Sequence, residues 1–130
     1  MKIHIKSTYI ATTTLLLCHQ IDATYWKEWE MFSLPFGYYL YLLFNLAVIP
    51  VLLVGLTKLD SPGEAFVYTN LCGLLGVITF VIHLVFWLIG FEQFLSFVSI
   101  LVLCLCLISG AFMLLTNDSH KLSRPAKLMD

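Results

Sequence analysis

The sequence predicts an all-α fold, a bundle of four transmembrane helices with both chain ends on the same side of the membrane. The first observation is composition: apolar and aromatic residues make up 60% of the 130 residues, and charged residues only 12%. Average soluble proteins reach about 45–50% apolar residues even with glycine counted. The second observation is that the charges lie between apolar runs, each about as long as the roughly 20 residues that a spanning helix needs.

Four apolar runs are the predicted spans, and they use most of the chain. They cover residues 7–26, 36–57, 66–90 and 94–116. The connections between the runs are short, which leaves no room for a separate soluble domain. We therefore expect residues 1–130 to form a single four-span membrane domain.

The basic residues predict how the spans are oriented. Four crossings place six of them on one side of the membrane: Lys2, Lys6, Lys58, Lys121, Arg124 and Lys127. The other side carries only Lys27. Because basic residues accumulate in cytoplasmic segments, we expect both termini in the cytoplasm and the protein in the inner (plasma) membrane. The net charge of −1 gives no electrostatic reason to expect nucleic acid as a partner.

Residues that bend helices or let them approach closely lie inside the later runs. Asn45 and Pro50 belong to the second run, and Pro50 is expected to kink it because proline donates no backbone hydrogen bond. Gly73 and Gly76 in the third run and Gly110 in the fourth are small residues of the kind that permit close helix contacts in membranes. We expect these five residues to shape the packing of the bundle.

Aromatic residues mark the places where the first and third runs should leave the bilayer. Tyr25, Trp26 and Trp29 lie at the end of the first run, and Trp87 lies near the end of the third. Tyrosine and tryptophan concentrate at membrane–water interfaces. These four residues are therefore predicted to lie at the outer interface.

Two histidines, His19 and His83, lie inside predicted spans at the same predicted depth. Each is seven residues from the outer end of its run, at residues 26 and 90, which corresponds to about 10 Å. Asp22 follows His19 by three residues and shares its helix face. Ionisable residues inside spanning helices are costly and usually face a protein-enclosed site. We expect these three side chains to converge in the outer half of the bundle.

Such a cluster can support several kinds of chemistry. His19, Asp22 and His83 form a suitable ligand set for a divalent metal such as zinc, iron or manganese. Glu28 or Glu30 would then serve as general acid or base from the outer side. Alternatively, a carboxylate beside a histidine relays protons, or the polar groups only hydrogen-bond and tie two spans together. Haem held by the two histidines is the least favoured cofactor.

The same residues carry a family resemblance. The stretches L-L-C-H-Q-I-D-A, E-W-E-M-F and F-V-I-H-L-V-F-W resemble an uncharacterised family of small bacterial membrane proteins with four spans and an H-E-x-D-A…E-W pattern. The chain departs from the pattern at Gln20, where the family tends to have Glu, and at Lys27, where a second His is common. The resemblance implies no established activity. The positions that match it are His19, Asp22, Ala23, Glu28, Trp29 and His83.

Three functions of different classes remain open on the sequence. The first is an interaction or accessory protein of the lipid bilayer, self-associating or bound to another membrane protein, whose polar cluster fixes helix packing. The second is a small metal-dependent membrane enzyme that uses the same cluster. The third is an oligomeric transporter of ions, protons or small molecules.

Overall fold

The protein is built from helices joined by short connections. A computed structural model describes the backbone of residues 2–122 and the side chains of residues 4–117. Within this part of the chain there is no strand, and the helices are α1 (Lys2–Tyr25), α2 (Glu28–Met31), α3 (Tyr38–Lys58), α4 (Pro62–Leu88) and α5 (Phe97–Leu122). The predicted all-α class is confirmed. Of the residues used to predict orientation, Arg124 and Lys127 lie outside the described residues, as do the side chains of Lys2 and Lys121.

Local backbone chemistry sets the ends of the helices. Proline at position 62 opens α4, where a missing backbone N–H costs nothing because first-turn donors have no helical partner. Helix α5 begins at Phe97, three residues after the start of the predicted run at residue 94. Phe94 has a left-handed φ of 64°, and a helix cannot continue through that conformation.

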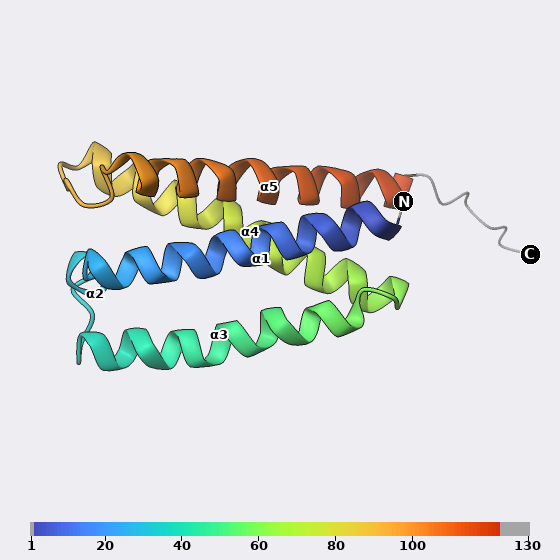
Figure 1. Cartoon of the computed structure of the whole chain (residues 1–130), viewed down its shortest axis with the longest axis horizontal. Coiled ribbons are helices and arrows are strands. Elements are labelled where there is room, and N and C mark those ends of the chain that lie inside the picture. Colours follow the sequence, from blue (N-terminus) through green and yellow to red (C-terminus); the bar gives the residue numbers. More distant parts are fainter. Residues whose placement is uncertain (1, 123–130) are drawn as a thin grey trace, which may run out of the picture.

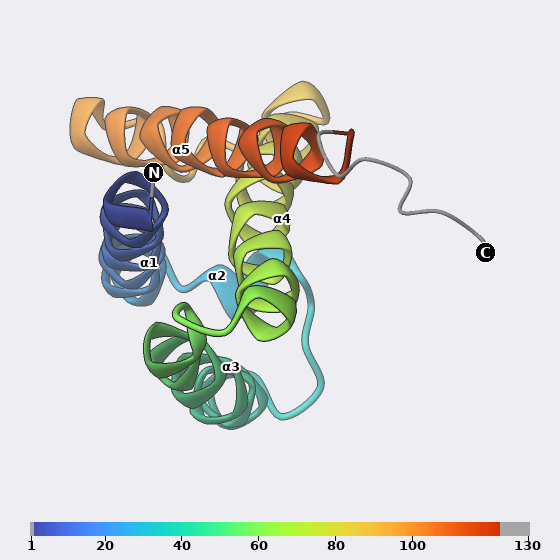
Figure 2. The same ribbon diagram turned by 90° about the vertical axis from the view of Figure 1, so that its right-hand side faces the viewer.

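The four long helices lie side by side, and successive ones run in opposite directions (Figure 1). The beginning of α1 and the end of α5 therefore lie at one end of the bundle, and α2 and the α4–α5 connection at the other. Figure 2 shows α5 on one side of α1 and α4, and α3 on the opposite side. Helix α5 packs extensively against α4 and α1, whereas α3 packs against α4 and to a smaller extent against α1.

Glycine residues bring α4 and α5 into backbone contact. A Cβ atom added to Gly76 would lie 2.7 Å from the carbonyl oxygen of Cys106, and one added to Gly110 would lie 2.6 Å from that of Gly73. Any larger residue would force the helices apart. Asn117 also donates a hydrogen bond from α5 to the Thr69 hydroxyl of α4 at 2.7 Å. The α4–α5 pair is the most closely packed part of the bundle.

Helix α3 is more loosely attached and contains Pro50. The proline leaves the carbonyl of Leu46 without its usual helical donor. Two residues beyond Pro50, the carbonyl of Leu52 accepts a hydrogen bond of 2.9 Å from the hydroxyl of Tyr9 in α1. Asn45 donates to the Tyr41 carbonyl of its own helix at 3.0 Å. The contact from Tyr9 thus holds α3 to α1 close to the proline.

Among the described residues, three helical segments are long and apolar enough to cross a membrane: Tyr38–Lys58, Pro62–Leu88 and Phe97–Asn117. Their outward faces carry large apolar side chains such as Leu46 and Ile108, each more than half exposed. Apolar faces of this extent are unusual on soluble monomers. These are the features of a small membrane protein. Helix α1 is as long but less apolar, because threonines and charged residues interrupt it.

Candidate metal centre

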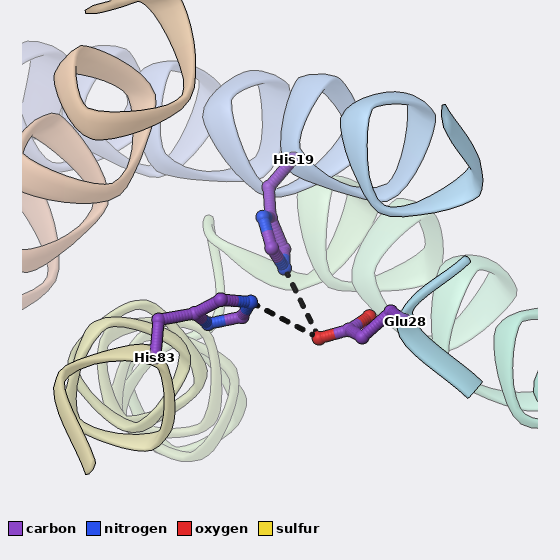
Figure 3. Close-up of side chains that lie close together, drawn as sticks. All are labelled: His19, Glu28 and His83. Carbon is purple, nitrogen blue, oxygen red and sulfur yellow. Dashed lines mark ion pairs between the residues drawn. The ribbon is translucent and has the colours of Figure 1, made fainter. Parts of the chain in front are cut away.

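His19, Glu28 and His83 come together at the end of the bundle where α2 lies (Figure 3). Glu28 Oε1 lies 3.3 Å from His83 Nε2 and 3.7 Å from His19 Nε2. One ligand atom from each residue lies within 4.8 Å of the other two, and all three side chains are buried. The three residues come from α1, α2 and α4, so the bundle must be folded to assemble them.

A reversal of the chain after α1 carries Glu28 into the bundle. Lys27 adopts a left-handed conformation with φ 52°, and its carbonyl accepts a hydrogen bond from the Glu30 amide at 2.8 Å. The short helix that follows buries Glu28 and Met31 and leaves Glu30 outside. The connection thereby delivers one acidic side chain to the interior.

His83 is oriented by its own helix. Its Nδ1 lies 2.7 Å from the carbonyl oxygen of Thr79, one turn earlier in α4. A carbonyl can only accept, so Nδ1 is the donor, and Nε2 is left to face Glu28. Metal-binding histidines usually use their second nitrogen in this way, which fixes the ring and its tautomer. His19 Nδ1, by contrast, is buried without a hydrogen-bond partner.

Phe94 packs against both imidazoles. Its ring centroid lies 4.3 Å from that of His83 and 5.5 Å from that of His19, and its side chain is fully buried. The left-handed backbone at this residue stores strain of about 1–3 kcal/mol in a non-glycine residue. The α4–α5 connection is thus held in a costly conformation that seals one side of the histidine pair.

The charges in the centre are strongly coupled. Burial by itself raises the pKa of the Glu28 carboxyl, but hydrogen bonding and charge from His19 and His83 outweigh it and lower the pKa from 4.5 to about 2. Glu28 is therefore a carboxylate at neutral pH. Because it faces two imidazole nitrogens in a buried space, a positive charge between them, either a proton or a metal ion, stabilises the arrangement.

The centre opens into an apolar cavity of about 320 Å³ between α1, α3 and α4. The polar end of the cavity is formed by the three centre residues together with Gln20 and Asn45. The rest of the wall is largely apolar and includes Leu16, Val48, Leu52, Leu75 and Ile78.

Not all of the predicted site residues lie in the centre. Asp22 is half-buried with Oδ2 unpartnered, and its carboxylate is not among the ligand atoms that converge. Glu30 is exposed and pairs with Lys27 at 3.7 Å. Metal binding by Asp22 and acid–base chemistry by Glu30 stay predictions. Two contributors were missed from the sequence, the Thr79 carbonyl and Phe94, since neither residue type signals a site by itself.

The predicted interface aromatics lie around this end of the bundle. Trp26 Nε1 donates to the Ser99 hydroxyl at 3.1 Å, and Trp87 Nε1 donates to the Gln93 carbonyl at 2.9 Å. Trp29 packs against Tyr41, with ring centroids 5.4 Å apart. Tyr25 is largely exposed. Aromatic side chains thus lie around the end of the bundle that carries the centre.

Comparison with known proteins gives a family and no activity. No curated protein and no solved structure matches the chain. The model of a family of unknown function, DUF6713, matches residues 5–119, which include all three residues of the centre. The chain therefore belongs to the family of unknown function DUF6713.

Proposed function

We propose that this protein is a small membrane metalloprotein in which His19, Glu28 and His83 bind one divalent transition-metal ion for catalysis. The observation that carries the proposal is the convergence of the three ligand atoms within 4.8 Å, with His83 Nε2 already turned toward Glu28. Among the functions open on the sequence, this choice favours the metal-dependent enzyme, with Glu28 as a ligand.

The distances support a metal centre. Two ligands that each lie about 2.0–2.1 Å from a tetrahedral ion are about 3.3 Å apart. The separations of Glu28 Oε1 from the two Nε2 atoms, 3.3 and 3.7 Å, need only a small adjustment to reach that value. The ligand nitrogens of His19 and His83, within 4.8 Å of each other, would come together around the ion. A purely structural ion pair has less in its favour, because desolvation of buried charges largely cancels their attraction.

The donor set narrows the choice of ion. Two imidazole nitrogens and one carboxylate are the ligands of catalytic zinc sites and of the facial triad of non-haem Fe(II) enzymes. Structural zinc is almost always held by four protein ligands, whereas three leave positions for water or substrate. The cavity lies beside the centre and provides space for a substrate at those positions.

For the membrane topology, we propose that α1 is a fourth span and that both termini are cytoplasmic. Helix α1 has 24 residues, about 36 Å at 1.5 Å per residue, and runs alongside the three apolar helices. Its hydroxyls are partly satisfied within the helix, since Thr12 donates to the Thr8 carbonyl at 2.9 Å. With the basic residues inside, the centre belongs to the outer half of an inner (plasma) membrane.

The test is metal binding by the purified full-length chain in detergent. The protein is stripped with a chelator and titrated with Zn²⁺, and anaerobically with Fe²⁺, with elemental analysis of the bound ion. We expect one ion per chain in the wild type and a loss of more than tenfold in affinity in His19→Ala, His83→Ala and Glu28→Gln. Matched controls are His4→Ala and Glu30→Gln, whose side chains are exposed.

The absence of metal binding would contradict the proposed enzyme. If the wild type binds no stoichiometric ion and the centre variants lose only thermal stability, the metal-dependent enzyme is excluded. The three residues would then have the packing role of an accessory protein. An optical spectrum of the same sample tests haem. Native mass spectrometry of that sample measures the self-association expected from the sequence.

A further inference from the structure

The cavity beside the centre is an elongated slot with one polar end. Along α3 it extends from Tyr41 to Leu52, and along α4 from His83 back to Leu75. These segments correspond to about 16 Å and 12 Å of helix. A volume of about 320 Å³ lies at the lower end of the range for small-molecule sites, which is about 300–1,000 Å³. The slot therefore has the dimensions of a narrow, elongated ligand.

The wall chemistry changes along the slot. At the end next to α2 lie His19, Glu28 and His83, and beyond them the wall is formed mainly by aliphatic side chains. Two wall residues, Phe44 and Ile78, are also exposed on the outer surface of the bundle. The wall of the slot therefore reaches the outward surface of α3 and α4, which faces lipid in the proposed membrane topology. An occupant with a polar head and an apolar tail can enter it from the bilayer.

The charge of the proposed metal centre indicates which polar head group the occupant of the slot carries. Among the residues that line the slot, Glu28 is the single acidic residue, and none is Lys or Arg. A divalent ion held by two neutral imidazoles and one carboxylate keeps one unit of positive charge. Uncompensated charge in apolar surroundings is costly, so a second carboxylate on the open coordination position stabilises the centre.

We propose that the slot binds an unesterified fatty acid from the bilayer, with its carboxylate on the metal ion and its hydrocarbon chain between α3 and α4. The inference deepens the proposed function and rests on it. The carboxylate supplies the missing negative charge, and the unbranched chain fits a slot whose far walls offer few polar groups. A hydrocarbon ligand without a charged head group cannot supply the negative charge.

The experiment uses the full-length protein in detergent, loaded with Zn²⁺, and dodecanoic acid labelled with ¹³C at the carboxyl carbon. NMR of that carbon reports both binding and contact with the ion. We expect saturable binding that weakens at least tenfold in the metal-free protein. The neutral analogue 1-dodecanol should bind at least tenfold more weakly than the acid.

Two valine variants on α3 separate the slot from the metal centre. Val48 lines the slot, whereas Val51, on the same helix, does not. In Val48→Trp we expect Zn²⁺ stoichiometry to be unchanged and acid affinity to fall at least tenfold, while Val51→Trp leaves both unchanged. Leu75→Phe narrows the slot from α4 and replaces Val48→Trp if that variant does not fold.

The outcomes distinguish the two proposals. Absence of Zn²⁺ binding overturns both the metal centre and the fatty acid site. Normal Zn²⁺ binding with no acid binding, or with acid binding that Val48→Trp leaves intact, overturns the fatty acid site alone. A phospholipid that displaces the acid at equal concentration would assign the slot to esterified chains and overturn the proposal as stated.

Discussion

His83 and Thr79 form a hydrogen bond within one turn of α4 that determines which imidazole nitrogen faces Glu28. The 2.7 Å contact joins Nδ1 to a main-chain carbonyl, so it does not depend on the type of side chain at position 79. The helix that carries His83 thus also orients it. A ligand oriented before the ion arrives loses less conformational freedom on binding.

This arrangement predicts a specific NMR signature for His83. With ¹⁵N-labelled histidine, we expect Nδ1 to carry its proton both before and after Zn²⁺ is added, while the Nε2 resonance shifts on binding. His83→Ala identifies the signal. A zinc-induced shift at Nδ1 in place of Nε2 would contradict the hydrogen bond to Thr79.

The turn at Lys27 should respond strongly to residue type. A left-handed conformation costs about 1–2 kcal/mol for a non-glycine residue, and β-branched residues tolerate it worst. We expect Lys27→Val to lower the free energy of unfolding by about that amount and to weaken Zn²⁺ binding, since Glu28 is displaced. Lys27→Gly should retain both the free energy of unfolding and the free energy of Zn²⁺ binding within about 1 kcal/mol. Equal effects of the two variants would show that the turn does not position Glu28.

Phe94 should be among the costliest side chains to remove. Phe94→Ala deletes a fully buried ring that packs on both imidazoles, and such truncations cost about 3–5 kcal/mol. Phe97→Ala is the matched control, because Phe97 is largely exposed. Thermal unfolding in detergent compares the two. We also expect weaker Zn²⁺ binding in Phe94→Ala, and a normal affinity would separate the ring from the centre.

Close packing of α4 and α5 predicts intolerance at Gly76. In Gly76→Leu the new side chain meets the Cys106 carbonyl, and overpacking of this kind costs about 1–3 kcal/mol or more. At Gly63 an added Cβ meets nothing within 4 Å, so Gly63→Leu serves as the control. Unfolding midpoints measure the difference. If both variants are equally stable, the helix contact at Gly76 is wrong.

Acid should destabilise the metal-free protein through Glu28. The pKa of this carboxyl is about 2 in the folded protein, below its ordinary value of 4.5. Stability from the carboxylate is therefore fully present above pH 4.5 and is lost as the pH falls toward 2, because the unfolded chain takes up the proton first. We expect Glu28→Gln to show a weaker loss over this interval than Glu30→Gln. Identical pH profiles for the two variants would refute the coupling.

The sequence predicted those features that follow directly from the chemistry of a residue type. Apolar runs predicted long helices, and the membrane cost of ionisable groups singled out His19 and His83, which do lie together. Glu28 was assigned to the outer side because nothing in the sequence marks Lys27 as left-handed. The same limit applies to Phe94, whose conformation depends on packing between α4 and α5. Backbone reversals in short connections determine which side chains reach the centre, and a hydropathy pattern does not predict such reversals.

The order in which the chain is made has a consequence for the centre. Residues 19 and 28 are synthesised early, but His83 follows only after α3 and most of α4. The three proposed ligands therefore meet only after α4 has been made and has packed on α1. The proposed ion, if it needs all three residues, is therefore acquired only after this packing, from the compartment that the α2 end of the bundle faces.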